Sequence, residues 1–211
     1  MPADWFFSVD EEYENTVVIS KSRFIATLIP IKDHADALEK VKAIGKKYSD
    51  ATHNCYAFIS NSTATEQKFS DDGEPQGTAG MPMLEVLRKR KVYMTLAVVT
   101  RYFGGIKLGA NGLVGAYSTS VAQALDRAIM HKNEYASIYE ITCGYATYKK
   151  ASEICAKHGG QCILTQYDKD VQVKVALPEK DAKKAIDEVV DLTQGAAGIV
   201  KIGEGYFKFE I

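Results

Sequence analysis

The chain has 211 residues, of which 46% are hydrophobic and 25% are charged, a balance that excludes an intrinsically disordered protein. Its 26 lysines and arginines offset 27 aspartates and glutamates, which excludes nucleic-acid binding driven by overall charge and leaves room only for a local basic patch. No apolar run approaches the roughly 20 residues that a membrane helix needs, so we expect no membrane partner.

The four cysteines and four histidines show neither Cys-x-x-Cys spacing nor the clusters typical of zinc sites. We therefore expect reduced thiols, a cytoplasmic protein, and neither a metal nor a cofactor. The acidic and aromatic residues 1–14 lack the positive start and the apolar stretch of a signal peptide.

In the first half, β-branched and apolar runs predict strands, and apolar residues at helical spacing predict helices. The expected strands are residues 16–20, 24–31, 55–60 and 93–102. The expected helices are one that Asp33 caps, one over residues 82–89 and one over residues 112–130. The polar residues 61–80 are expected to form a long loop, and the apolar middle of 93–102 predicts a strand covered on both faces.

In the second half, the pattern predicts the order βαββαβ, which is typical of a ferredoxin-like domain. The expected strands are residues 137–145, 161–167, 171–177 and 199–209, and the expected helices are 148–158 and 179–193. We place the domain boundary between residues 1–135 and 136–211, and we expect both domains to be of the α+β class.

The strongest local signal is residues 98–112, which read VVTRYFGGIKLGANG. A buried strand ends there, glycines permit a turn, and a helix begins, so outward-facing amides could hold a phosphate or another anion. The spacing matches neither a Walker A loop nor Gly-x-Gly-x-x-Gly, and the glycines could instead only shape a tight connection. The candidate ligand-binding residues in this segment are Arg101, Tyr102, Gly104, Gly105, Lys107 and Gly109.

Other charged residues are candidates for the same site. Three carboxylates, Asp71, Asp72 and Glu74, could hold Mg²⁺ or could form a solvated turn. His53, before an expected strand, could be a general base, a phosphate ligand or a structural histidine. The basic segment 20–24 could contact phosphate oxygens. Cys55 has apolar neighbours, and burial would make its thiol inert.

Four ordered motifs over about 100 residues resemble the signature motifs of the IMPACT family, of the bacterial YigZ type. They are residues 20–24 (SKSRF), 51–58 (ATHNCYAF), 71–82 (DDGEPQGTAGMP) and 98–109 (VVTRYFGGIKLG). The resemblance implies a first domain similar to the βαβ fold of a small-subunit ribosomal protein domain and elongation factor G domain IV. It implies a second domain similar to the ferredoxin-like domain V of elongation factor G.

The resemblance also bears on function, because eukaryotic relatives act in translation control by inhibiting a kinase that phosphorylates an initiation factor. We expect a translation-associated regulator that binds RNA, the ribosome or another phosphate-bearing partner through its first domain. Two alternatives remain open. One is a metal-dependent hydrolase of phosphoesters or peptides built on His53, Asp72 and Glu74, and the other is a protein-binding adaptor without catalysis.

Overall fold

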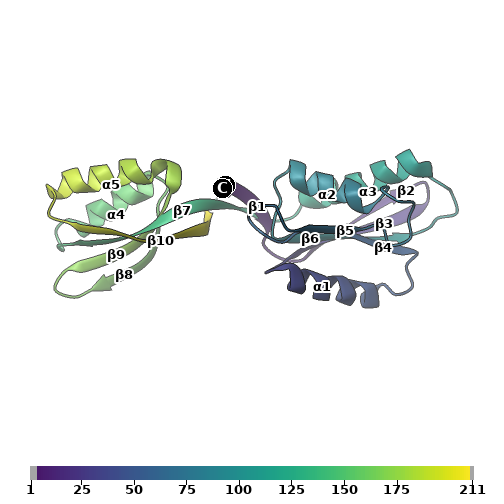
Figure 1. Cartoon of the computed structure of the whole chain (residues 1–211), viewed down its shortest axis with the longest axis horizontal. Helices are drawn as coiled ribbons and strands as arrows, with labels where there is room; N and C mark the ends of the chain where they lie inside the picture. Colours follow the sequence, from purple (N-terminus) through teal and green to yellow (C-terminus); the bar gives the residue numbers. More distant parts are fainter. Residues whose placement is uncertain (1–3, 210–211) are drawn as a thin grey trace. The chain divides into compact units, whose positions relative to one another are not determined.

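A computed structural model of the chain describes residues 4–209 and divides it into two compact units of the predicted α+β class (Figure 1). The first unit ends at Lys132 and the second begins at Asn133, within a few residues of the predicted boundary. In the described part of the chain, no helix is long and apolar enough to cross a membrane.

The first unit is built on an antiparallel sheet in the order β2-β3-β6-β4-β5. Its strands are β2 (Tyr13–Ile19), β3 (Ser22–Pro30), β4 (His53–Ile59), β5 (Gln67–Ser70) and β6 (Thr95–Tyr102). Its helices are α1 (His34–Lys47), α2 (Gly80–Lys89) and α3 (Gly109–Leu125), and β1 (Trp5–Val9) precedes them all. Together these elements make a three-layer arrangement with the sheet in the middle.

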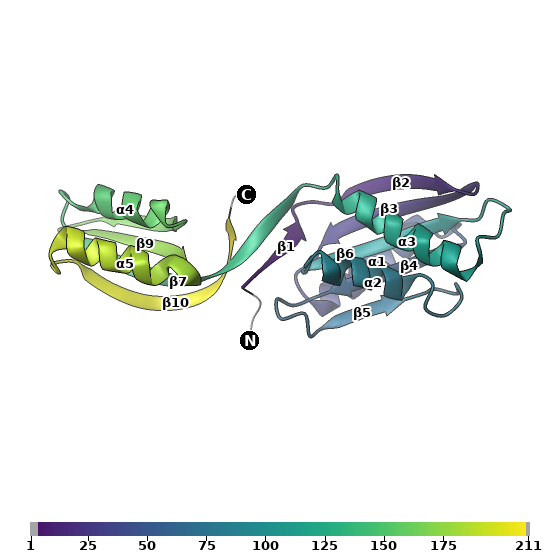
Figure 2. The same ribbon diagram turned by 90° about the horizontal axis from the view of Figure 1, so that it is seen from above.

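The central strand β6 explains this layering. Figures 1 and 2 show α1 on one face of the sheet and α2 with α3 on the other. Leu96 and Val98 of β6 pack in one apolar cluster with Ala37 and Ile44 of α1. Every residue of β6 before Tyr102 is buried, which confirms the prediction that this strand is covered on both faces.

Several boundaries differ from those predicted. The segment 61–80, expected to be a loop, contains the short strand β5, and β1 was not predicted. Helix α3 ends at Leu125, before the expected end at Met130, because the chain turns there into the next strand. The predicted cap of α1 is confirmed, since the Asp33 carboxylate accepts the Asp36 N–H at 2.8 Å.

The second unit has the predicted order βαββαβ. Its elements are β7 (Met130–Cys143), α4 (Tyr148–Lys157), β8 (Gln161–Tyr167), β9 (Val171–Pro178), α5 (Glu179–Thr193) and β10 (Gly198–Phe209). The first residues of β7 belong to the first unit, where this strand pairs with β1. The strands pair in the order β10-β7-β9-β8, and both helices cover one face of this sheet. A separate apolar core lies between this sheet and its two helices and includes Ile141, Leu177 and Val189.

Candidate functional site

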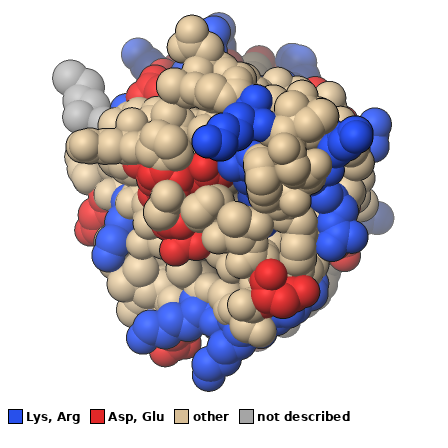
Figure 3. Space-filling model, turned by 90° about the vertical axis from the view of Figure 1, so that its right-hand side faces the viewer, with Lys and Arg blue, Asp and Glu red and all other residues tan. Residues whose placement is uncertain are grey.

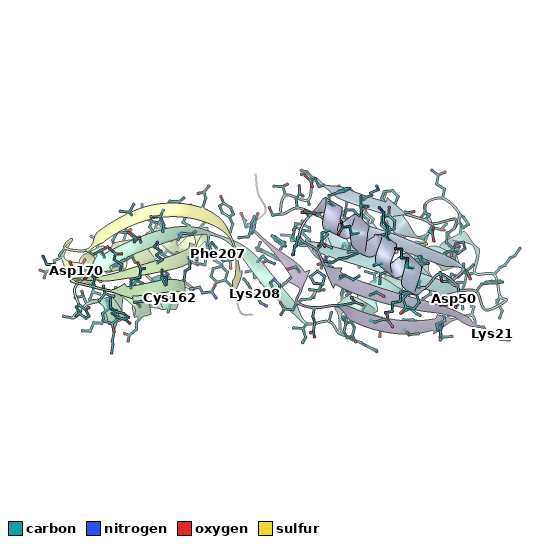
Figure 4. The ribbon with its side chains drawn as sticks, turned by 90° about the horizontal axis from the view of Figure 1, so that it is seen from below. Lys21, Asp50, Cys162, Asp170, Phe207 and Lys208 are labelled. Carbon is teal, nitrogen blue, oxygen red and sulfur yellow. The ribbon has the colours of Figure 1, made fainter. Side chains whose placement is uncertain are left out.

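The predicted site lies where β6 ends and α3 begins. The chain leaves the sheet at Tyr102, runs through residues 103–108, and enters α3 at Gly109. This loop lies against the turn between β2 and β3, where Ser20 and Lys21 adopt positive φ angles of 48° and 65°. Figure 4 labels Lys21 at this end of the first unit. We call the surface formed by Lys21, Arg23, Tyr102, Phe103, Ile106 and Lys107 the tip.

Arg101 does not face solvent in the tip, which corrects the expectation that its guanidinium is open to a ligand. The residue is only 5% exposed. Its Nη1 donates to Glu74 Oε1 at 2.6 Å, and the Tyr117 hydroxyl donates to the same oxygen at 2.7 Å. A buried charge is stable only when it is paired and hydrogen-bonded, so this ion pair is an internal support of the site.

Two aromatic rings enclose the buried guanidinium. The Arg101 guanidinium carbon lies 5.4 Å from the ring centroids of both Phe24 and Phe103, within the range of cation–π attraction. Phe24 is fully buried, whereas Phe103 is 46% exposed. One side of the Phe103 ring thus contacts Arg101 while part of the ring remains open to solvent.

Gly104 is required where two loops of this chain pack against each other. A Cβ atom on Gly104 would lie 2.0 Å from the Lys21 carbonyl carbon and oxygen, so only glycine fits between the two loops. The Gly104 N–H donates to Ser22 Oγ at 3.1 Å, which fixes this contact. Gly105 and Gly109 have φ angles of 85° and 70° with open space around them. The close approach at Gly104 is therefore between two parts of this chain.

The structure brings His53, Asp72 and Glu74 together around this ion pair. His53 Nδ1 lies 2.7 Å from the Asp72 carbonyl oxygen, and its Nε2 lies 3.8 Å from Glu74 Oε2. The Asp72 carboxylate accepts the Asn54 N–H at 2.6 Å. The carboxylates of Asp72 and Glu74 therefore hold β4, the loop and β6 together.

The carboxylate of Asp71 is occupied as well, because it accepts the backbone N–H groups of Gly77, Ala79 and Gly80 at 2.8 to 3.1 Å. These bonds anchor the loop to the start of α2. Among residues 4–209, no group of three or more histidines, cysteines, aspartates and glutamates is arranged to hold a metal ion. Asp71, Asp72 and Glu74 thus each accept hydrogen bonds from other parts of the chain.

Cys55 and Tyr117 extend the same network into the core. The Cys55 thiol donates to the Asp71 carbonyl oxygen at 2.9 Å and lies 3.4 Å from the Tyr117 hydroxyl. Burial raises the pKa of the Cys55 thiol to about 12, and burial also raises the pKa of the Tyr117 hydroxyl. Both groups therefore stay neutral at physiological pH, which fits a structural role.

The exposed part of the tip combines apolar and cationic side chains. Phe103 and Ile106 are 46% and 45% exposed. Lys21 and Lys107 are exposed and form no ion pair among residues 4–209. The Arg23 guanidinium carbon lies 4.5 Å above the Tyr102 ring. Figure 3 views this end of the molecule and shows lysine and arginine side chains separated by acidic residues and by residues of other kinds.

The acidic residue Asp50 borders the tip. Asp50, labelled in Figure 4, accepts a hydrogen bond from the Tyr102 hydroxyl at 2.8 Å, and this bond raises the pKa of Tyr102. Phe103 and Ile106 were not among the predicted site residues. Their exposure could have been predicted from the sequence, because apolar residues in a glycine-rich loop have few neighbours against which to be buried.

Comparison with known proteins settles the family. Residues 20–125 match the Impact N-terminal domain, and residues 141–196 match a domain of unknown function (DUF1949). The chain is 39% identical over 201 residues to IMPACT family member YvyE of Bacillus subtilis (strain 168), covering 94% of this chain and 91% of that protein. The chain belongs to the IMPACT family. The resemblance inferred from the motifs is thereby confirmed.

Further IMPACT family relatives span different lengths. IMPACT family member YigZ of Escherichia coli (strain K12) is 35% identical over 192 residues, covering 88% of this chain and 92% of that protein. Protein IMPACT homolog of Dictyostelium discoideum is 35% identical over 111 residues, covering 50% of this chain and 31% of that protein. A solved structure titled "Crystal structure of an hypothetical protein" matches with a TM-score of 0.60 at 31% identity, covering 95% of this chain and 98% of that one.

The buried ion pair leads to a prediction about stability. Glu74→Gln should lower the free energy of unfolding by about 3–5 kcal/mol, because it leaves the Arg101 charge buried without a counter-charge. Glu85→Gln removes a carboxylate from the solvent-exposed pair with Arg88 and should cost under about 1 kcal/mol. Urea denaturation of both variants measures the difference, and equal small losses would show that the Arg101–Glu74 pair is not buried.

The thiol environment leads to a second prediction. In the folded protein at about pH 8, iodoacetamide should modify the exposed Cys162 and leave Cys55 intact, because burial keeps Cys55 protonated and inaccessible. Peptide mass spectrometry after a short reaction reports both sites in one sample. Labelling of Cys55 at the rate of Cys162 would contradict the buried network, and labelling of both in urea is the positive control.

Proposed function

We propose that this chain is a translation-associated regulatory protein that binds ribosomal RNA through the tip of its first unit. The observation that carries the proposal is the exposure of Phe103 and Ile106 beside Lys21, Arg23 and Lys107. Lysine and arginine pair with phosphates, and exposed rings stack on bases, so the two kinds of side chain together suit RNA.

Membership of the IMPACT family supports the link to translation, because eukaryotic relatives in this family act in translation control. Arg101 has a positioning role in this proposal, since its ion pair holds Phe103 and the loop in place. Lys107 and the open backbone at Gly105 remain proposed phosphate contacts, and Lys21 and Arg23 join them. Tyr102 orients Arg23 by stacking.

Hydrolysis is less well supported by the geometry. Asp72 and Glu74 already accept internal hydrogen bonds, and Glu74 is bound to Arg101 and Tyr117. A general base or metal ligand needs a free lone pair directed at substrate or ion. Two nitrogens of this network have no hydrogen-bond partner among the described residues: His53 Nε2, which lies 3.8 Å from the Glu74 carboxylate, and the buried Arg101 Nε.

The proposal is tested by sedimentation with purified bacterial ribosomal subunits at several salt concentrations. Lys21→Gln combined with Lys107→Gln should weaken binding and reduce the slope of log K against log salt by roughly one unit for each lost phosphate contact. Lys42→Gln with Lys89→Gln is the matched control, because both lysines are exposed on the first unit and form no ion pair among the described residues.

Three outcomes would overturn the proposal: no binding by the unmodified protein, binding that salt does not affect, or equal losses in the tip and control variants. Affinity purification from cells with and without ribonuclease complements this test. Loss of the bound ribosomal RNA and proteins after ribonuclease supports the proposal. A stoichiometric protein partner that survives ribonuclease, with no RNA bound before treatment, would instead favour the adaptor.

A further inference from the structure

A cluster of three tyrosines lies at one end of the second unit. Tyr145 follows β7, Tyr148 is the first residue of α4, and Tyr167 ends β8. The ring centroids are 5.8 to 6.4 Å apart; Tyr148 stands nearly perpendicular to the other two rings, whereas Tyr145 and Tyr167 lie within 27° of parallel. Figure 4 labels Asp170, which lies in the hairpin turn just after Tyr167. We call these three residues the tyrosine platform.

The platform exposes much aromatic surface. Tyr145 is 54% exposed and Tyr167 is 61% exposed, while Tyr148 packs against the apolar core of the unit. A large aromatic side chain normally contributes most of its area to a core or to an interface. Since the fold uses only Tyr148 in this way, the other two rings are left facing outward.

The exposed rings are nevertheless held in place. The Tyr145 hydroxyl donates to the Asp168 carbonyl oxygen at 2.7 Å, and the Tyr167 ring packs edge to face with the ring of Tyr148, with 5.8 Å between the centroids. A ring that is already fixed loses little conformational entropy when a flat partner stacks on it. The platform is therefore preorganised for stacking.

Three lysines lie next to the platform residues along the chain. Lys149 and Lys150 lie in the first turn of α4, and Lys169 lies in the hairpin turn; none forms an ion pair among residues 4–209. Positive charge in a first helical turn opposes the helix dipole, so the helix itself does not stabilise these two lysines. The acidic neighbours are Asp168 and Asp170 in the hairpin and, one turn along α4, Glu153.

This charge balance distinguishes between possible nucleic-acid ligands. Three lysines against three carboxylates give little net attraction for the dense phosphates of a duplex. Stacking on aromatic rings contributes about 1–3 kcal/mol per base and requires bases that are not paired in a helix. The rings therefore favour a single strand, with the lysines placed for its neighbouring phosphates.

We propose that the tyrosine platform binds unpaired bases of single-stranded RNA, which stack on Tyr145 and Tyr167 while Lys149, Lys150 and Lys169 contact flanking phosphates. This proposal rests on the proposed function in taking RNA as the ligand. It adds a second RNA-binding surface, on the second unit, with a different preference. The tip contacts ribosomal RNA through cationic and apolar side chains, whereas the platform prefers bases that are not paired.

The test uses the full chain and fluorescence anisotropy of a labelled oligouridylate of roughly 12 nucleotides. Tyr145→Leu combined with Tyr167→Leu should weaken binding at least about 30-fold, since two stacked bases are lost at about 1–3 kcal/mol each and every 1.4 kcal/mol is tenfold in affinity. The matched control, Tyr145→Phe with Tyr167→Phe, keeps both rings and should stay within about 3-fold of the unmodified protein. A duplex RNA of equal length should bind more weakly than the single strand.

Equal affinities for the leucine variant and the unmodified protein would overturn the proposal, as would equal losses in the leucine and phenylalanine variants or stronger binding of the duplex. If circular dichroism shows that the leucine variant is unfolded, photo-crosslinking of the unmodified protein to 4-thiouridine RNA tests the platform instead. Crosslinks to Tyr145 or Tyr167 support the platform, and crosslinks confined to other residues contradict it.

The variant Lys21→Gln with Lys107→Gln separates this proposal from the proposed function. Oligouridylate binding that survives in this variant and is lost in the leucine variant supports the platform even if ribosome binding by the tip fails. Oligouridylate binding lost in the tip variant and unchanged in the leucine variant refutes the platform and leaves the tip as the RNA-binding surface.

Discussion

The ion pair between Arg101 and Glu74 is the interaction on which the candidate site depends. Both side chains are almost fully removed from water, and each charge is stable there only because the other is present. Through this pair the end of β6 is joined to the loop before α2, and Tyr117 joins α3 to the same carboxylate. Three segments far apart in the sequence thus meet at one carboxyl group.

The exposed tip follows from this buried arrangement. Phe103 covers the Arg101 guanidinium, and Ser22 accepts hydrogen bonds from both Arg101 and Gly104. Since Gly104 also lies against the Lys21 backbone, the positions of the loop and the β2–β3 turn are set together. The side chains proposed to contact RNA are therefore carried on loops that the protein interior holds in place, which lowers the entropic cost of binding.

Structural features that depend on the local pattern of residues could be predicted from the sequence. The apolar run of β6, the Asp33 cap and the βαββαβ order of the second unit were all predicted and all lie in the structure. The short strand β5 was missed, because its four residues, Gln-Lys-Phe-Ser, have no clear alternation of polar and apolar side chains. The motifs of the first half also identified the family.

The burial of Arg101 could not be predicted as readily. A signal existed, since Ala97, Val99 and Arg101 alternate along β6 and share the face covered by α2 and α3. The partner, however, is 27 positions away in a loop of several carboxylates, and spacing alone does not say which of Asp71, Asp72 and Glu74 turns inward. Long-range pairing of charges is decided by tertiary packing.

The most direct measurement of this account is hydrogen exchange of arginine side chains by NMR. The guanidinium protons of Arg101 should exchange with water far more slowly than those of Arg23, which lies exposed over Tyr102. Arg101 protection should fall to the level of Arg23 in a Glu74→Gln variant that remains folded. Equal, fast exchange of Arg101 and Arg23 in the unmodified protein would contradict the buried pair and, with it, the support proposed for the tip.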